Sequence, residues 1–186
     1  VIIALAAFLR LYRLSEIPPG VNRDEASIGF TAYSLLQTGK DEYGRAFPLS
    51  FESFGDWQLP LYIYTSIPFV GLMGMTELAV RLPSALAGIF TIGALFVLVR
   101  TLFGNVTLAL LCSLILTLNP WHIHISRVES ESNVAILFST LATIFFLKAL
   151  TSKRTLLLSL AGIFFAATYY TYHGNHLFTT IYAAGL

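Results

Sequence analysis

Two adjacent carboxylates, Asp24 and Glu25, stand in a polar stretch that follows the apolar segment 1–14. Charged side chains beside a bilayer are costly to keep unless they bind a ligand or take part in a reaction. A carboxylate here could serve as a general base, or as a ligand for a divalent cation that holds a phosphate. The alternative is structural, because Asn22 can cap a helix whose first turn carries both acids. The spacing alone leaves both interpretations open.

A second polar cluster occupies the segment 119–133, where Trp121 indicates the membrane interface. Arg127 could bind a phosphate group, and Glu129 or Glu131 could face the first pair of acids. Alternatively, Arg127 and one of these glutamates form a surface ion pair, which contributes well under about 1 kcal/mol to stability.

A third cluster spans 169–176 and contains His173 and His176, which are three residues apart and could share one face of a helix. Together with nearby carboxylates, two histidines could bind Zn²⁺. The spacing matches no dedicated zinc motif, so interfacial hydrogen bonding is the alternative. The candidate metal ligands are Asp24, Glu129, His173 and His176.

The composition is that of a membrane protein. Of 186 residues, 56% are hydrophobic and only 11% are charged, and the mean hydropathy is +0.74. Soluble domains carry about a quarter charged residues, so we predict an integral membrane protein. The high apolar content argues against a nucleic-acid partner, and a single cysteine, Cys112, cannot form an intrachain disulfide. Both ends fall in apolar sequence, so we expect the N-terminal part of a larger multi-pass protein.

Hydropathy predicts five membrane spans, since a helix needs about 20 apolar residues, or about 17 at least, to cross a bilayer. The predicted spans are 1–14, 82–99, 105–121, 134–150 and 156–172. Within the long first loop, 15–81, the stretch 59–75 is apolar but is interrupted by Pro60 and Pro68. These prolines, and Trp57 at its edge, favour a juxtamembrane or re-entrant helix over a sixth span. If 59–75 did cross, the first loop would be cytoplasmic.

The short turns indicate sidedness. Arg100 marks one turn, and Lys148, Lys153 and Arg154 mark another that lies two spans later. Both turns are basic, so the positive-inside rule places them in the cytoplasm. The first loop, the turn at 121–132 and the segment 173–176 are then extracytoplasmic. The sequence therefore predicts an all-α, polytopic membrane bundle with a long extracytoplasmic first loop of juxtamembrane helices.

Taken in order, several segments resemble the N-terminal half of GT-C-type membrane glycosyltransferases of the family-39 kind. That group includes protein O-mannosyltransferases, lipid A aminoarabinose transferases and related bacterial enzymes. The matching segments are Asp24-Glu25, 39–48, 54–62, 81–88, Ser126-Arg127 and 131–133. Gln58-Leu59-Pro60-Leu61 departs from the Lys-Pro-Pro-Leu element that is usual in the bacterial loop.

The resemblance implies transfer of a sugar, with inversion, from a polyprenyl-phosphate donor to a protein, lipid or glycan acceptor. The reaction would take place at the extracytoplasmic face of the plasma (inner) membrane. Asp24 and Glu25 would be catalytic, with Asp24 as the candidate general base. The residues expected to bind substrate are Arg127, Glu129, Glu131, Asn133, Tyr172 and His173. Some GT-C enzymes use a divalent cation and others do not, so this requirement stays open.

Two other classes of protein are less consistent with the sequence. A secondary transporter or flippase would carry ionisable residues near the bilayer midplane and an inverted repeat. The mid-span segments 86–96 and 137–146 carry no charge, and the polar groups gather at one membrane surface. A non-catalytic scaffold would not need acidic and histidine clusters from three separate segments on one side.

Overall fold

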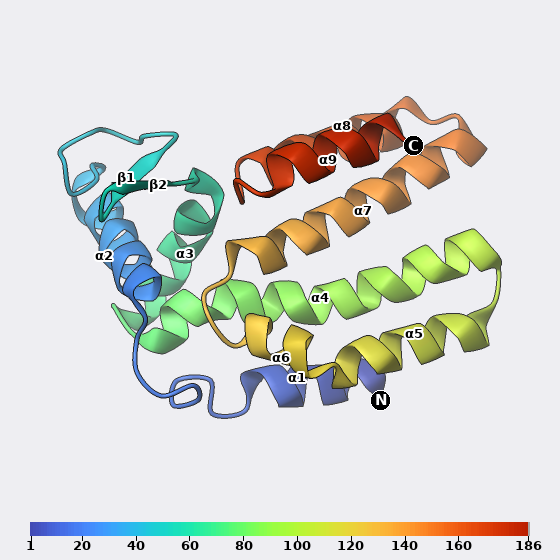
Figure 1. Ribbon diagram of the computed structural model, residues 1–186, viewed down its shortest axis with the longest axis horizontal. Coiled ribbons are helices and arrows are strands. Elements are labelled where there is room, and N and C mark those ends of the chain that lie inside the picture. The colour runs from blue at the N-terminus through green and yellow to red at the C-terminus, as the bar shows by residue number, and fades with distance from the viewer. Residues whose placement is uncertain (186) are drawn as a thin grey trace.

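The computed structural model describes residues 1–185 and consists of long apolar helices with a smaller polar layer across one end (Figure 1). In chain order the elements are α1 (Ile2–Leu11), α2 (Arg23–Thr38), β1 (Phe51–Ser53), β2 (Asp56–Gln58), α3 (Pro60–Met73), α4 (Glu77–Phe103), α5 (Val106–Leu118), α6 (Pro120–Ser126), α7 (Glu131–Ser152), α8 (Thr155–Tyr169) and α9 (Asn175–Ala184). The predicted all-α class is confirmed, and the short β1–β2 hairpin is its one addition within the described residues.

Two helices in the described part of the chain, α4 with 27 residues and α7 with 22, are long and apolar enough to cross a bilayer. A third span is possible if α5 and α6 are taken together as one broken helix. With 10 and 15 residues, α1 and α8 are shorter. At 1.5 Å per residue, α8 is about 22 Å long, less than the hydrocarbon core of about 30 Å. Membrane crossing by α1 and α8 therefore stays a prediction.

The stretch 105–121, predicted as a single span, is broken by a bend of 64° between α5 and α6. Pro120 is the first residue of α6, and the residue before it, Asn119, is held in an extended conformation. The Asn119 side chain then accepts the backbone N–H of His122 and caps the new helix. A glycine of α4 lets α6 pack close, because a Cβ at Gly88 would overlap the Ser126 side chain.

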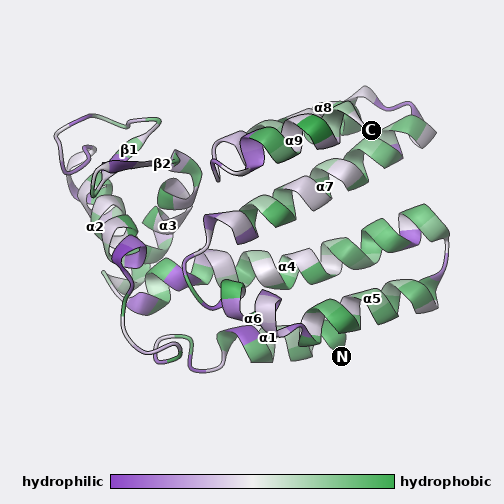
Figure 2. Ribbon diagram, viewed as in Figure 1, coloured by the Kyte–Doolittle hydropathy of each residue, from purple (hydrophilic) through white to green (hydrophobic). Residues whose placement is uncertain are grey.

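The polar segments are divided between the two ends of the bundle (Figure 2). The basic α4–α5 and α7–α8 turns share one end, and the first-loop elements gather at the other (Figure 1). The α6–α7 loop and the α8–α9 turn also lie at the first-loop end. There α2 and α3 lie across the bundle, transverse to α4 and α7. Ile28 and Ala32 of α2 and Tyr62 and Ile63 of α3 are buried in the same core as residues of α4 and α7.

The hairpin is anchored to this layer by one buried ring and one polar contact. Phe51 is 1% exposed and its ring packs edge-on against Tyr64. Ser53 Oγ lies 2.7 Å from Ser27 Oγ of α2. Phe54 and Gly55 both have positive φ, the backbone conformation that tight two-residue hairpin turns require. The turn places β2 beside the N-terminus of α2, where the acidic pair lies.

Candidate active site

A pocket of about 310 Å³ lies where the start of α2, the β1–β2 hairpin, the α6–α7 loop and the α8–α9 turn meet. Its lining residues are Arg23, Asp24, Ile28, Ser53, Asp56, Trp57, Gln58, Glu129, Ser130, Glu131, Ser132, Tyr172 and His173. The three polar clusters seen in the sequence therefore share one site. Five of the predicted site residues line it: Asp24, Glu129, Glu131, Tyr172 and His173. Glu25, Arg127, Asn133 and His176 lie outside the lining.

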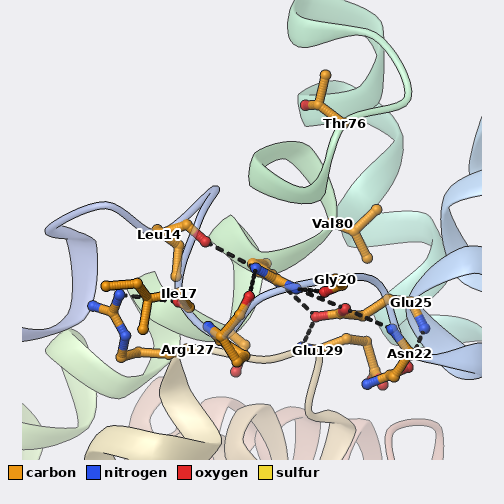
Figure 3. Close-up of polar contacts among 12 residues, drawn as sticks. Leu14, Ile17, Gly20, Asn22, Glu25, Thr76, Val80, Arg127 and Glu129 are labelled. Atoms are coloured by element: carbon orange, nitrogen blue, oxygen red, sulfur yellow. Dashed lines mark hydrogen bonds and ion pairs between the residues drawn. The ribbon is translucent and has the colours of Figure 1, made fainter.

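Glu25 is buried behind the pocket, with 2% exposure, and joins three segments of the chain. Its Oε1 lies 2.7 Å from Arg81 Nε, and its Oε2 lies 3.0 Å from a second guanidinium nitrogen of Arg81. The backbone N–H groups of Asn22 and Glu129 also donate to this carboxylate, at 3.1 and 3.2 Å. Figure 3 shows Glu25 between these two residues. Glu25 thus fixes the start of α2 and the α6–α7 loop relative to each other.

The hydrogen bonds to Glu25 also affect the pKa of its carboxyl group. Burial alone raises the pKa of this carboxyl, but the hydrogen bonds from Arg81, Asn22 and Glu129 outweigh burial and lower the pKa below its ordinary value. Asn22 accepts the Glu25 N–H at 2.7 Å in return, so the two residues form a capping box. The predicted cap at Asn22 is confirmed, and the side chain of Glu25 is occupied by structural bonds.

Asp24, in contrast, faces the pocket with half of its side chain exposed. Within residues 1–185, its carboxylate has one ion-pair partner, Arg23, with Nε 3.5 Å from Oδ1. This long contact leaves lone pairs open toward the pocket. Asp24 therefore has the geometry of a group that can accept a proton from a bound molecule.

Glu129 and Glu131 differ from the half-exposed Asp24 because each has a buried carboxyl oxygen. The Oε1 atom of each is buried and has no hydrogen-bond partner among the described residues. Burial is the main reason that the pKa of Glu129 rises to about 8, and the nearby charges of Asp24 and Glu25 raise it further. A Glu129 with this pKa is mostly protonated at neutral pH and can donate a hydrogen bond to a ligand oxygen.

The raised pKa of Glu129 predicts a pH dependence of stability. The folded protein binds this proton more tightly than the unfolded chain, so its contribution is complete below about pH 4.5 and is lost as pH rises through about 8. We expect the melting temperature in detergent to fall between pH 5 and about pH 9, and the Glu129→Gln variant to fall less.

The matched control for this prediction is Glu16→Gln, because Glu16 is an exposed carboxylate paired with Arg13 at the surface. Its melting temperature should follow the wild-type pH curve. Equal slopes for wild type and Glu129→Gln would show that Glu129 ionises normally in the folded protein.

Arg127 binds backbone carbonyls in and after the last turn of α1 and does not line the pocket. It is 8% exposed, and its guanidinium donates to the backbone carbonyls of Leu9, Tyr12 and Ile17 at 2.8, 2.7 and 3.0 Å. Carbonyls at the C-terminal end of a helix lack intrahelical partners and attract cations. Neither expected role, a phosphate contact or a surface ion pair with Glu129 or Glu131, fits this position.

The two histidines of the third cluster bind backbone carbonyls. His173 Nε2 lies 2.9 Å from Trp57 O, and His176 Nε2 lies 2.8 Å from Tyr169 O. Among residues 1–185, no three carboxylate, imidazole or thiol groups gather as a metal site would require. The candidate ligands Asp24, Glu129, His173 and His176 therefore do not form a metal site in this arrangement.

Asn133 is fully buried and binds α4. Its Nδ2 lies 2.8 Å from Ser84 O and 3.1 Å from Ser84 Oγ. This contact fixes the first turn of α7 against α4, just behind the pocket. The expected substrate contact of Asn133 has no support from this position, because the residue does not line the cavity.

The hairpin supplies site residues that the sequence motifs did not predict. Ser53, Asp56, Trp57 and Gln58 form one wall of the pocket. Arg23, Ile28, Ser130 and Ser132 complete the unpredicted set. One local signal was available, since Phe54-Gly55 can form a tight turn between two short segments that carry aromatic residues.

Comparison with known proteins identifies a family. The family of dolichyl-phosphate-mannose-protein mannosyltransferases matches residues 59–183, more than half of the chain and nearly everything from α3 to α9. No curated protein and no solved structure matches the chain. The match includes the walls of the pocket formed by the α6–α7 loop and the α8–α9 turn, and it begins after Asp24 and the hairpin. With its apolar helices and this match, the chain belongs to the dolichyl-phosphate-mannose-protein mannosyltransferase family of membrane glycosyltransferases.

Proposed function

We propose that this chain forms the acceptor-activating part of a glycosyltransferase that uses a polyprenyl-phosphate sugar as donor and inverts the anomeric carbon. The observation that carries the proposal is the pocket in which Asp24 faces Glu129 and Glu131 from a separate loop. Family membership supplies the reaction class, and the pocket supplies an accessible base.

In the proposed step, Asp24 accepts the proton of the acceptor hydroxyl as its oxygen bonds to the anomeric carbon. The bond from that carbon to the phosphate oxygen breaks on the opposite face, and the polyprenyl phosphate leaves with the electron pair. Glu129 and Glu131 hold oxygens of the sugar or the acceptor through carboxyl groups that have unused lone pairs.

The charge distribution supports an extracytoplasmic location for the site. The basic α4–α5 and α7–α8 turns belong in the cytoplasm by the positive-inside rule. The loops that line the pocket are at the other end of the bundle (Figure 1). We therefore propose that transfer takes place on the extracytoplasmic side of the plasma membrane. The transverse position of α3 supports a juxtamembrane helix that does not cross, which leaves the first loop on the same side as the α6–α7 loop.

A transfer assay tests the proposal. Membranes that contain the full chain should move label from a radiolabelled polyprenyl-phosphate hexose to a product that organic solvent does not extract, while membranes without the chain should not. Digestion with α- and β-specific glycosidases then reads the product anomer. Inversion is expected, because attack opposite the leaving group reverses the configuration. Transfer from a nucleotide sugar alone, or a product that keeps the anomer of the donor, would contradict the proposal.

A further inference from the structure

A second cavity lies between α2, the loop that follows α2 and the turn of the hairpin, and it shares no lining residue with the candidate active site. We propose that this cavity is a binding site for an organic ammonium group, which three aromatic rings and one carboxylate hold. Its volume is about 270 Å³, and its lining residues are Ala26, Ser27, Phe30, Glu42, Tyr43 and Phe54. The site goes beyond the proposed function, because the sugar-transfer step involves none of these residues.

Three exposed aromatic side chains surround the cavity. Phe30 of α2, Tyr43 of the following loop and Phe54 of the hairpin turn are 47%, 52% and 66% exposed. Exposed apolar side chains that gather at one place are characteristic of a binding surface. The face of an aromatic ring attracts a cation within about 6 Å of its centre, and groups of rings bind quaternary ammonium ligands in this way. The short side chains of Ala26 and Ser27 leave room between the rings.

Two of the three rings already attract a cation from the chain itself. Arg23 Cζ lies 5.4 Å from the centre of the Phe54 ring, and Arg45 Cζ lies 5.3 Å from the centre of the Tyr43 ring. Both rings also line the cavity and are more than half exposed, so each keeps surface for a ligand. Phe30 has no arginine or lysine over its ring in the described part of the chain. The rings are therefore accessible to positive charge, and the Phe30 ring is unused.

Glu42 supplies a negative charge to the same cavity. It is exposed, and its carboxylate forms no ion pair with any residue from 1 to 185. The charges around Tyr43 act in the same direction. Desolvation is the main reason that the pKa of the Tyr43 hydroxyl is raised, and the carboxylates of Glu52 and Glu42 raise it further against the opposing charge of Arg45. The local charge therefore favours a positively charged ligand.

The chemistry of the cavity favours an alkylated ammonium group over a metal ion. A metal ion such as Ca²⁺ requires six or more oxygen ligands, and Glu42 is the one carboxylate among the described lining residues. A quaternary ammonium has no N–H group that needs an acceptor, so aromatic rings suit it. Such groups occur free, as in choline, and in zwitterionic lipid headgroups. In a headgroup the neighbouring phosphate would have Arg23 available, because Arg23 is exposed and its contact to Asp24 is 3.5 Å long.

Saturation-transfer NMR tests the site with the full chain in an uncharged maltoside detergent. Choline is compared with its neutral isostere 3,3-dimethylbutan-1-ol, which has the same shape without the charge. The choline methyl protons should receive saturation from the protein, and the neutral isostere should bind at least about tenfold more weakly. Equal binding of the two compounds, or no saturation transfer to choline, would overturn the proposal.

Matched variants locate the binding. Phe30→Leu keeps an apolar side chain but removes the ring, and Glu42→Gln removes the charge, so each should weaken choline binding at least about threefold. Tyr33→Leu is the control, because Tyr33 is also on α2, is 42% exposed and does not line the cavity. Tyr33→Leu and Tyr43→Phe, which keeps its ring, should bind as wild type does. Circular dichroism checks folding, and unchanged affinity in folded Phe30→Leu or Glu42→Gln would contradict the proposal.

Competition with glycerophosphocholine separates the two sources of the ammonium group. If glycerophosphocholine displaces choline at a similar or lower concentration, the site accepts a lipid headgroup. If it does not displace choline, the site takes the free ammonium compound. Both results support an ammonium site and differ only in its source. The readout is binding alone, so the site stands or fails independently of the sugar-transfer assay.

Discussion

Asp24→Asn is expected to abolish sugar transfer while the protein still folds and inserts into the membrane. Asparagine keeps the size and shape of aspartate but cannot accept the proton of the acceptor hydroxyl. Positioned general bases contribute roughly 10²–10⁴-fold to rate, so turnover in the membrane transfer assay should fall by that factor. The Asp24 side chain is half exposed and its one ion pair is long, so stability should change little.

Glu16→Gln is the matched control, because it removes one exposed negative charge from the same loop at a residue that does not line the pocket. Its transfer rate should equal that of wild type. Asp24→Glu keeps the charge and displaces it by one methylene, so a rate between wild type and Asp24→Asn is expected. Normal turnover in a folded Asp24→Asn protein would remove Asp24 as the base.

Local sequence signals predicted where the helix that carries Asp24 begins and at which end of the bundle the site lies. Asn22 was expected to cap a helix whose first turn carries both acids, and it is the N-cap of α2. Counting spans between basic turns placed the acidic clusters and His173 at one end, and five predicted site residues do line one pocket. Both inferences use information that a single sequence contains. The first uses the spacing of neighbouring residues, and the second uses the number of spans between two basic turns.

Contacts between distant residues were not predictable in the same way. Arg127 and Leu9 are 118 positions apart, and Glu25 and Arg81 are 56 apart. Nothing near Arg127 in the sequence indicates that the carbonyls at the end of α1 need a cation. The sequence analysis expected both acids of the pair to be catalytic, but the tertiary fold turns Glu25 inward and leaves Asp24 at the pocket.

Short elements were missed for a different reason. The strands β1 and β2 have three residues each, too few for alternation to be distinguished from chance. The bend at Pro120 was hidden by hydropathy, because α5 and α6 together form one continuous apolar stretch. In both places the missed feature lies next to the site, since the hairpin forms a wall of the pocket and the loop after α6 supplies Glu129 and Ser130 to its lining.

Arg81→Met is expected to be the most destabilising single substitution near the site. The Arg81 side chain has 0% exposure, and it donates to Glu25 and to the carbonyls of Leu14, Pro18 and Gly20 at 3.1, 3.0 and 2.5 Å. Its removal leaves a buried carboxylate and these carbonyls without their partner. Breaking a buried ion pair in this way costs about 3–5 kcal/mol, because the remaining charge stays desolvated. Thermal unfolding in detergent, followed by circular dichroism, should show a large fall in melting temperature.

The exposed pair between Arg45 and Glu52 provides the matched comparison, with N–O distance 2.8 Å and side-chain exposures of 41% and 34%. Arg45→Met should cost no more than about 1 kcal/mol, because water screens that pair. Adding Glu25→Gln to Arg81→Met should restore part of the lost stability, since no unpaired charge then remains. If Arg81→Met and Arg45→Met melt alike, the buried pair does not hold the site together. If the double variant recovers stability but not transfer, the ion pair between Glu25 and Arg81 is needed to hold the site in position. The Glu25 carboxylate accepts the backbone N–H groups of Glu129 and of Asn22, two residues before Asp24.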